Sequence, residues 1–232
     1  MNIVYAATRN LYEPLSVTMR SLLKHNKPDM LYILAEDDEL PFEIDAPHKV
    51  INVADQTYFP PDGPNSSSVF TYMAMMRALY VDLMPECDKV LQLDIDTIVC
   101  EDLTPLYNIN LLDKWVAACP EYFANYKPFQ MQYYNIGVCV YNLAQIRADH
   151  VVPLMVRDLN LNKYMCLEQD MFNKYGVPLG KFVAIPNRYN DSFCCGYTEN
   201  PAVVHFAGFP DWFTNPYVPR REYLDRYIGD LI

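Results

Sequence analysis

Hydrophobic residues recur along this chain with two alternating periods, one typical of buried strands and one of amphipathic helices. Short apolar runs occupy residues 3–7, 30–35 and 50–53. Between the first two lies a stretch with helical spacing, residues 13–24, whose apolar stripe comprises Leu15, Met19, Leu22 and Leu23. Strands that alternate with helices predict an α/β fold with a mainly parallel central sheet.

The alternation continues with longer interruptions. We predict further helices at about 69–84 and 167–175, and further strands at 90–93, 115–119, 137–141, 182–185 and 202–205. Residues 55–68 are rich in proline, glycine and serine, which predicts a loop that ends where a serine caps the next helix. A second long loop is predicted at 120–133. Residues 220–227 are typical of a short amphipathic helix, which we expect to dock onto the domain rather than onto a membrane.

The segment Asp94-Ile95-Asp96 directly follows the predicted strand 90–93. Residues i and i+2 of an extended segment point the same way, so Asp94 and Asp96 converge on one cation if that geometry continues. Two oxygen ligands with open positions suit Mg²⁺ or Mn²⁺, which can bridge to phosphate groups. Ligands of open α/β sheets bind at the carboxyl ends of strands, where this pair falls. A turn or helix cap built from aspartates is the simpler alternative.

Arg77 lies within the apolar stripe of the predicted helix 69–84. A guanidinium on a face directed at the core needs an anionic partner. We expect this partner to be Asp94 or the phosphates of a ligand. The alternatives are a side chain that extends to solvent or one that pairs with a purely structural acid.

Two further sets of polar residues lie at the ends of predicted elements. Glu168, Gln169 and Asp170 open the predicted helix 167–175. The apolar stripe of that helix places Glu168 and Gln169 off the core, near the positive end of the helix dipole, where acids also occur without a functional role. His205 ends the predicted strand 202–205, either as an ordinary polar residue or as a ligand for a borderline metal.

Composition narrows the function classes. A chain of 232 residues with 51% hydrophobic content fits one α/β domain, and a net charge of −11 argues against a nucleic-acid partner. The seven cysteines show neither the paired framework of a small secreted domain nor a zinc spacing, so reduced thiols in the cytoplasm are expected. The chain begins with an apolar strand and has no long apolar span, which predicts a soluble protein without stable membrane insertion.

Taken in order, these segments resemble glycosyltransferase family 8, the group that includes glycogenins and bacterial lipooligosaccharide galactosyltransferases. The likeness runs from Asn2 to Trp212 and is strongest at residues 87–96 and at Leu103-Thr104-Pro105-Leu106. Residues 134–138 are similar to the family's Phe-Asn-x-Gly-Val stretch, and 168–170 to its Asp-Gln-Asp. His205-Phe206-Ala207-Gly208 is similar to the opening of its His-x-x-Gly-x-x-Lys-Pro-Trp motif.

This resemblance implies one glycosyltransferase A domain over residues 1–232, a Rossmann-like α/β fold with a nucleotide-binding half at about 1–100 and an acceptor-binding half at about 101–232. It implies transfer of a hexose, glucose or galactose, from a UDP-sugar to a saccharide or glycoconjugate acceptor, with retention at the anomeric carbon. Family members often attach to membranes through a basic, aromatic C-terminal tail, and this sequence stops about where that tail would begin, so we expect a soluble acceptor or a membrane acceptor met through another protein.

Carried over by position, the resemblance assigns Mn²⁺, or alternatively Mg²⁺, to Asp94, Asp96 and His205. It assigns the donor sugar to Asn135, Glu168 and Gln169. The nucleotide and its phosphates fall to a wider set, in which Gly208 lets backbone approach the diphosphate: Ala6, Ala7, Thr8, Asn10, Arg77, Asp94, Ile95 and Gly208.

Three positions depart from the family pattern. Thr8 stands where the family usually has an aspartate that bonds uracil, and Glu168 replaces an aspartate that reaches hydroxyls of the sugar. No lysine follows His205, because the chain continues as Phe209-Pro210-Asp211-Trp212. The candidates to replace that cation are Arg9, Arg77 and Arg188.

Two mechanisms give retention. One is a covalent intermediate on a carboxylate, for which Glu168 and Asp170 are the candidates. The other, which we favour, is departure and attack on the same face, with Gln169 stabilising the developing positive charge. The predicted loops 55–68 and 120–133 are candidates for a lid and an acceptor wall. Aromatic residues near them could stack on a sugar or belong to the core: Tyr122, Phe123, Tyr126, Phe129, Tyr133, Tyr134 and Trp212.

Two other function classes share part of this pattern. Haloacid-dehalogenase phosphatases also place Asp-x-Asp after an apolar strand, but their chain opens with that strand, and here the pair is followed by Thr97-Ile98. A sugar-nucleotide or glycan-binding module with a decayed site would fit the missing lysine and Thr8. Hydrolysis of a UDP-sugar in the absence of acceptor separates an enzyme from such a module.

Overall fold

Seven strands form the central sheet of the computed structural model, which describes residues 1–68, 70–122 and 132–229. In sheet order these are β3 (His48–Asn52), β2 (Met30–Ala35), β1 (Asn2–Ala6), β4 (Lys89–Leu93), β7 (Tyr134–Asn142), β6 (Val116–Pro120) and β8 (Phe182–Ala184). Only β7 runs antiparallel to its neighbours, β4 and β6. The remaining pairs are parallel, as alternating strands and helices predict.

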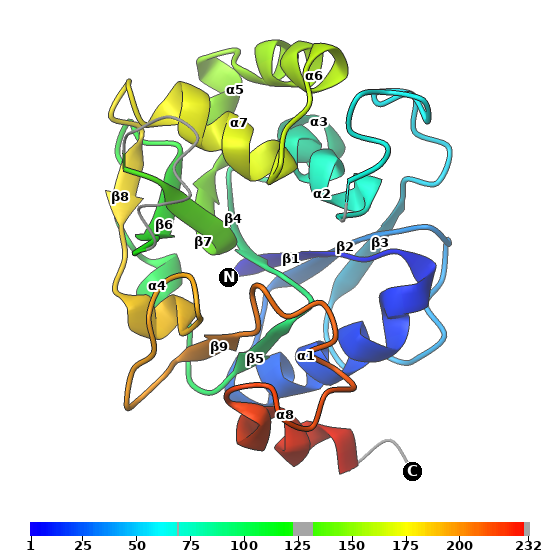
Figure 1. The fold of residues 1–232 in the computed structure, drawn as a ribbon, viewed down its shortest axis with the longest axis vertical. Coiled ribbons are helices and arrows are strands. Elements are labelled where there is room, and N and C mark those ends of the chain that lie inside the picture. Colours follow the sequence, from blue (N-terminus) through cyan, green and yellow to red (C-terminus); the bar gives the residue numbers. More distant parts are fainter. Residues whose placement is uncertain (69, 123–131, 230–232) are drawn as a thin grey trace.

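Helices cover both faces of the sheet (Figure 1). On one face, α1 (Tyr12–His25) packs Leu15, Met19 and Leu22 against the strands. The other face is covered by α2 (Tyr72–Met76), α3 (Tyr80–Leu83), α5 (Leu143–Ala148), α6 (Val152–Leu161) and α7 (Leu167–Gly176). Side chains of a strand alternate between faces, so Ile3 and Tyr5 of β1 lie in the first core and Val4 in the second.

A small second sheet pairs β5 (Thr97–Val99) antiparallel with β9 (Val203–His205). Its apolar residues pack on α1 and on α8 (Arg221–Ile228), whose Leu224 and Tyr227 are buried. The predicted docking of the C-terminal helix onto the domain is therefore confirmed. None of the helices that the structure describes combines the length and the apolar composition required to cross a membrane.

The predicted helix at 69–84 is corrected by the structure. Residue 69 lies outside the described ranges, the helix starts at Tyr72, and a 3₁₀ turn over Arg77–Leu79 separates α2 from α3. The predicted serine cap is also absent, because the Ser68 hydroxyl accepts a hydrogen bond from the Phe70 amide two residues on. Such a local turn competes with helix formation and delays the start of α2.

The pattern missed several short elements: β5, α4 (Thr104–Tyr107), α5 and α6. The start of α5 carried a signal, because the Asn142 side chain accepts a hydrogen bond from the Gln145 amide as an N-cap. The start of α6 carried another, because Pro153 occupies its first turn.

A buried carboxylate joins α6 to α7, the helix that carries Glu168 to Asp170. Asp158 accepts hydrogen bonds from Lys174, Tyr164 and Tyr175. Burial by itself would raise the pKa of Asp158, but these donors outweigh burial and lower it to about 2. This contribution to stability is present above the pKa of the unfolded carboxyl and is lost as the pH falls toward the folded value.

We expect Asp158→Asn to lower the free energy of unfolding by about 2 kcal/mol at neutral pH, and the difference from wild type to shrink as the pH falls below about 4. Urea unfolding between pH 7 and pH 3 measures this. Asp88, with an 80% exposed side chain, provides the control, since Asp88→Asn should leave stability unchanged at every pH. A constant difference across the range would contradict the assignment.

Candidate active site

Three predicted metal ligands meet at the carboxyl end of β4. Asp94 follows that strand directly, and Asp96 precedes β5, whose Thr97 pairs with His205 of β9. His205 Nε2 lies 3.3 Å from Asp96 Oδ1 and 3.8 Å from Asp94 Oδ2. One potential ligand atom from each residue lies within 4.8 Å of the others, so the three side chains can share one cation.

Main-chain contacts hold the Asp94-Ile95-Asp96 segment in place. The Thr97 hydroxyl donates to the Asp94 carbonyl at 2.6 Å, and the Thr18 hydroxyl of α1 donates to the Ile95 carbonyl at 2.7 Å. The Phe206 amide donates to the Asp96 carbonyl at 2.9 Å. The backbone of this segment is thus fixed, and the Asp94 carboxylate is held in addition by Arg77 and by Gln92, which donates to Asp94 Oδ1 at 2.8 Å.

The orientation of His205 is set by a chain of amide side chains. Asn190 donates through Nδ2 to Asn135 Oδ1 at 2.9 Å, so its own Oδ1 is left to accept from His205 Nδ1 at 2.8 Å. This arrangement places a proton on Nδ1, so Nε2, which faces the carboxylates, is the ring nitrogen that could bind a metal. Two carboxylates and one neutral imidazole form a donor set that suits Mn²⁺ better than Mg²⁺, because imidazole favours the softer ion.

Gly137 of β7 permits the close approach of these ligands. Its carbonyl accepts a hydrogen bond from the Asp94 amide at 2.7 Å. A Cβ atom at this position would lie 2.3 Å from His205 Cε1 and 2.8 Å from Asp94 Oδ2. Only glycine fits here without displacing a ligand.

Gly137→Ala should therefore disrupt cation binding and lower stability by about 2 kcal/mol through overpacking. Thermal unfolding with and without Mn²⁺ tests both effects. Gly229→Ala is the matched control, since nothing lies within 4 Å of an added Cβ there. Retention of the Mn²⁺-induced shift in Gly137→Ala would show that the site lies elsewhere.

Arg77 has the anionic partners that its place in the apolar stripe predicts. Its guanidinium pairs with Asp94 through Nη1 and with Glu168 through Nη2. The expectation that Glu168 lies off the core is wrong, because this residue is fully buried. It follows Leu167, which adopts a left-handed conformation with φ of 49°, a strain typical of functional sites. The second carboxylate oxygen of Glu168 and the Nε of Arg77 are buried without a partner among the described residues.

Burial and charge act against each other on these groups. Burial raises the pKa of Glu168 to about 7, although Arg77 opposes the shift. Burial also raises the pKa of Asp94 despite the same arginine. For Asp96 the effect of His205 outweighs burial, so the pKa falls, and for His205 the carboxylates outweigh burial, so the pKa rises.

Gln169 and Asp170 differ in what their side chains can offer. Gln169 Oε1 accepts from the Ile136 amide at 3.1 Å, and its Nε2 donates to the Tyr133 hydroxyl at 3.1 Å. Asp170 accepts through Oδ1 from the Tyr133 hydroxyl at 2.5 Å, and through Oδ2 from the amides of residues 165 and 166. Both oxygens of Asp170 are thus occupied by donors at the start of α7.

Glu121 also belongs to this network, although the sequence pattern did not predict it. It follows β6, which runs parallel to β4, so both strands end at the same edge of the sheet. Its Oε1 accepts from Asn135 at 3.0 Å and from Gln169 at 3.4 Å. Burial raises the pKa of Glu121, while these two donors oppose the shift. The available signal was a carboxylate directly after an apolar strand, as for Asp94.

The predicted nucleotide contacts lie at the end of β1, next to β4. Ala7 donates its amide to the Leu34 carbonyl at 3.0 Å, and the Thr8 hydroxyl donates to Asn10 Oδ1 at 2.7 Å. Ala6 ends β1, and Ile95 packs against the core to which Ala7 belongs. Gly208 has a φ of 89° and is exposed, so its backbone is accessible to a ligand.

The arginines that could replace the missing lysine are all engaged in ion pairs. Arg9 pairs with Asp37 at 2.7 Å, and Arg188 with Glu101 at 2.7 Å. Arg77 holds Asp94 and Glu168 as described above. Among the three, only Arg77 contacts a residue of the cation site.

Most of the predicted aromatic and loop positions that the structure describes are part of the core. Tyr133 is buried, Tyr134 stacks on Phe182, and Trp212 stacks on Phe206. Tyr122 is 69% exposed and is available to an acceptor. Phe123, Tyr126 and Phe129 lie outside the described residues, as does most of the loop 120–133. The loop 55–68 is anchored to α6 by Asn65, which donates to the Leu159 carbonyl at 2.6 Å.

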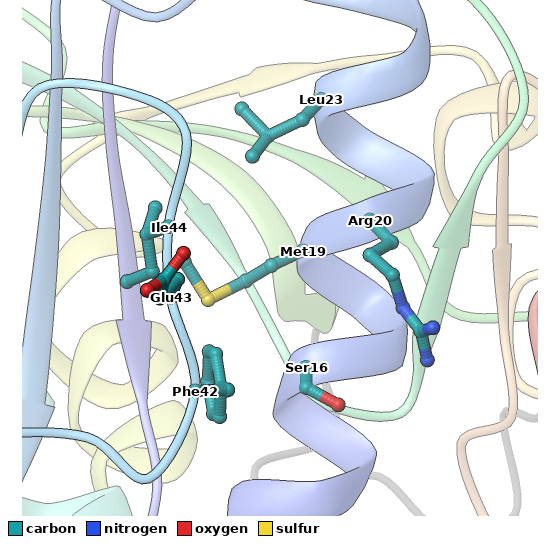
Figure 2. Close-up of a pocket in the computed structure, with 7 residues that line it drawn as sticks. All are labelled: Ser16, Met19, Arg20, Leu23, Phe42, Glu43 and Ile44. Atoms are coloured by element: carbon teal, nitrogen blue, oxygen red, sulfur yellow. The ribbon is translucent and has the colours of Figure 1, made fainter. Parts of the chain in front are cut away.

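A cavity of about 180 Å³ lies between α1 and residues 42–44, away from this site. Figure 2 shows Met19, Leu23 and Ile44 along it, while Arg20 points away. It contains none of the predicted site residues. The convergence of titratable groups at the strand ends is the stronger indication of chemistry.

Comparison with known proteins agrees with this geometry. The model of the family described as Glycosyl transferase family 8 matches residues 2–212. A protein of Haemophilus influenzae with a provisional glycosyltransferase name is 24% identical over 270 residues, covering 100% of this chain and 77% of that protein. Glycosyltransferase GlyD of Streptococcus pneumoniae is 25% identical over 240 residues, covering 89% of this chain but 28% of GlyD.

The fold likewise matches a solved glycosyltransferase. The structure of the galactosyltransferase LgtC in complex with donor and acceptor sugar analogues superposes with a TM-score of 0.72 at 21% identity, covering 99% of this chain and 96% of that one. The predicted α/β fold of the glycosyltransferase A type, with a mostly parallel sheet, is thereby confirmed. The chain is a glycosyltransferase and belongs to glycosyl transferase family 8.

Proposed function

We propose that this chain transfers a hexose, glucose or galactose, from a UDP-sugar to a saccharide or glycoconjugate acceptor with retention of anomeric configuration. The observation that carries the proposal is the convergence of Asp94, Asp96 and His205 beside the Arg77–Glu168 pair. A cation site next to a buried arginine and a buried carboxylate suits a diphosphate joined to a polyhydroxylated ring.

The residues have distinct roles in this proposal. Asp94, Asp96 and His205 hold Mn²⁺, with Mg²⁺ as the weaker alternative, and the ion supplies the Lewis acidity that stabilises negative charge on the departing UDP. Arg77 donates hydrogen bonds to the donor where the sugar joins the phosphate, and its ion pair with Asp94 keeps that carboxylate oriented. Glu168 and Asn135 face the donor sugar, and residues 6–8, Asn10 and Ile95 bind the nucleoside. Gly208 has no side chain, so the diphosphate can approach its backbone.

Transfer on one face of the donor agrees with the contacts of Gln169 and Asp170. Gln169 carries no charge and cannot act as a strong nucleophile, but its amide dipole can stabilise positive charge that develops at the anomeric carbon. Asp170 has both oxygens occupied, which disfavours a covalent role. Departing phosphate then takes the proton of the acceptor hydroxyl.

We also propose a cellular compartment for this protein and a division of its domain into two halves. All seven cysteines lie in the described ranges and are free thiols, which suits a reducing cytoplasm. The nucleotide-binding half comprises about residues 1–100, and the acceptor-binding half comprises about residues 101–232.

The phosphatase alternative loses its support, because the match to family 8 extends over residues 2–212.

Release of nucleoside diphosphate tests the proposal. UDP-glucose, UDP-galactose, a UDP-pentose and GDP-mannose are each incubated with Mn²⁺ or with EDTA, without acceptor, and free diphosphate is followed. Mn²⁺-dependent release from one UDP-hexose supports the proposal and names the sugar. Binding of UDP without release from any donor favours a binding module or an enzyme that needs its acceptor, and a saccharide acceptor panel then separates these two. Absence of UDP binding contradicts the proposal.

A further inference from the structure

A half-buried carboxylate lies at the carboxyl end of β2, beside the turn formed by residues 8–10. Glu36 directly follows this strand, and its Oε2 accepts a hydrogen bond from the Arg9 amide at 2.7 Å. Its Oε1 accepts from the Tyr72 hydroxyl of α2 at 3.1 Å. The carboxylate is therefore fixed between the end of β1 and the start of the helix that leads to Arg77.

The position of Glu36 relative to the cation site matches the length of a nucleotide. The order β2, β1, β4 places the end of β2 two strands from Asp94, which is a lateral distance of about 10 Å at the usual strand spacing. A nucleoside diphosphate with its phosphates at Asp94 and Asp96 can extend its base across this distance. A cavity of about 610 Å³ is lined by Arg9, Tyr12 and residues 37–41, the segment that directly follows Glu36 in the chain.

The other polar groups at this turn are already paired. The Thr8 hydroxyl and the Asn10 side-chain oxygen bond to each other at 2.7 Å. Asp37 is neutralised by the Arg9 guanidinium, whose Nε lies 2.8 Å from Asp37 Oδ2. In the part of the chain that the structure describes, Glu36 enters no ion pair, and its two recorded side-chain donors are a backbone amide and a phenol. A carboxylate offers about four acceptor sites, so capacity remains.

We propose that Glu36 accepts the ring N–H of the nucleobase and thereby selects a donor nucleotide whose base carries such a group. Uracil and guanine present a ring N–H on this edge, whereas cytosine and adenine present a ring nitrogen that accepts. A carboxylate bonds the former and repels the latter. This inference rests on the proposed function and adds the residue that recognises the base. Thr8 is uncharged and cannot provide the same selectivity.

Calorimetric titration of the full chain with UDP, CDP and GDP, each with Mn²⁺, tests the inference. Wild type should bind UDP about 10-fold more tightly than CDP, as expected for one hydrogen bond to a charged group. Glu36→Gln keeps the shape of the side chain and can accept from Arg9 while donating to Tyr72. This variant should lose about 10-fold in UDP affinity while CDP binding is unchanged or improved.

Controls separate base recognition from a structural role. Glu13→Gln removes an exposed carboxylate from the first turn of α1 and should preserve the UDP preference. Glu36→Asp retains the charge but shortens its reach, and should also reduce the preference for UDP, so a second variant is available if Glu36→Gln fails to fold. GDP distinguishes the two bases with a ring N–H: binding comparable to UDP supports recognition of that group alone, and weak binding supports it together with exclusion by size.

Several outcomes overturn the inference. Equal weakening of UDP and CDP in Glu36→Gln, or no change in either, would mean that Glu36 only supports the turn at Arg9. Absence of binding of every nucleotide to wild type would overturn the proposed function, and this inference with it. Unchanged preference together with metal-dependent UDP binding would overturn the inference alone.

Discussion

Replacement of Asp96 by asparagine should reduce Mn²⁺-dependent release of UDP about 1000-fold, since Asp96, as a charged ligand of the proposed metal site, would contribute about 4 kcal/mol of charge stabilisation in the transition state. Asp96 is the aspartate whose replacement tests the cation site alone. Its side chain lies 3.3 Å from His205 Nε2 and makes no contact with Arg77 among the recorded ion pairs of the described residues. Its substitution therefore alters the cation site while leaving the Arg77–Glu168 pair in place.

Asp94 provides the informative comparison, because it serves both the cation site and Arg77. Asp94→Asn should lose activity and, in addition, about 3 kcal/mol of stability, since it leaves a buried guanidinium with a single charged partner. Asp96→Asn should remain closer to wild type in urea unfolding without metal. Activity of Asp96→Asn near the wild-type level, measured with saturating Mn²⁺, would remove Asp96 from the ligand set.

The fold could be predicted because its central strands are bounded by clear turns. The segments around β1, β2 and β4 carry strong apolar runs, and the stripe of α1 has one unbroken period. The position of β7 between β4 and β6 could not be read, because an antiparallel strand in the middle of the sheet has the same apolar pattern as a parallel one. The shortest helices could not be predicted for another reason, since four to six residues give too little periodicity to recognise.

The site was predictable where a residue violated a local pattern. Arg77 in an apolar stripe demanded an acid, and the structure supplies Asp94 and Glu168. The burial of Glu168 was not predictable from the helix stripe alone. The stripe marks one buried face of α7, whereas a second face contacts the segment of Arg77, and the charge on that segment makes a buried carboxylate stable.

Glu121 and Glu36 were missed for a common reason. Each follows an apolar strand, yet a single carboxylate after a strand is frequent and becomes meaningful only when the order of strands is known. That order places Glu121 beside Asn135 and Glu36 beside the turn after β1. Pairwise spacing, as in Asp94-Ile95-Asp96, can be read from sequence, whereas neighbours across the sheet require the topology.

Gln169→Ala should lower turnover about 100-fold while leaving UDP affinity near the wild-type value, because in the proposed mechanism the side chain acts on charge at the anomeric carbon rather than on the nucleotide. Initial rates with the preferred UDP-sugar give kcat, and calorimetry with UDP and Mn²⁺ gives affinity. The split between the two quantities is the critical result. Loss of both in equal measure would show that Gln169 supports the structure of the site instead.

Tyr133→Phe separates these two roles of Gln169. Gln169 Nε2 donates to the Tyr133 hydroxyl, which in turn donates to Asp170, so the phenylalanine variant removes the support and retains the amide. We expect its turnover to fall by less than 10-fold, as for the loss of one neutral hydrogen bond. A fall as large as that of Gln169→Ala would mean that positioning by Tyr133, rather than the dipole of the amide itself, limits the reaction. The difference between the two variants therefore measures what the amide contributes at the reacting carbon.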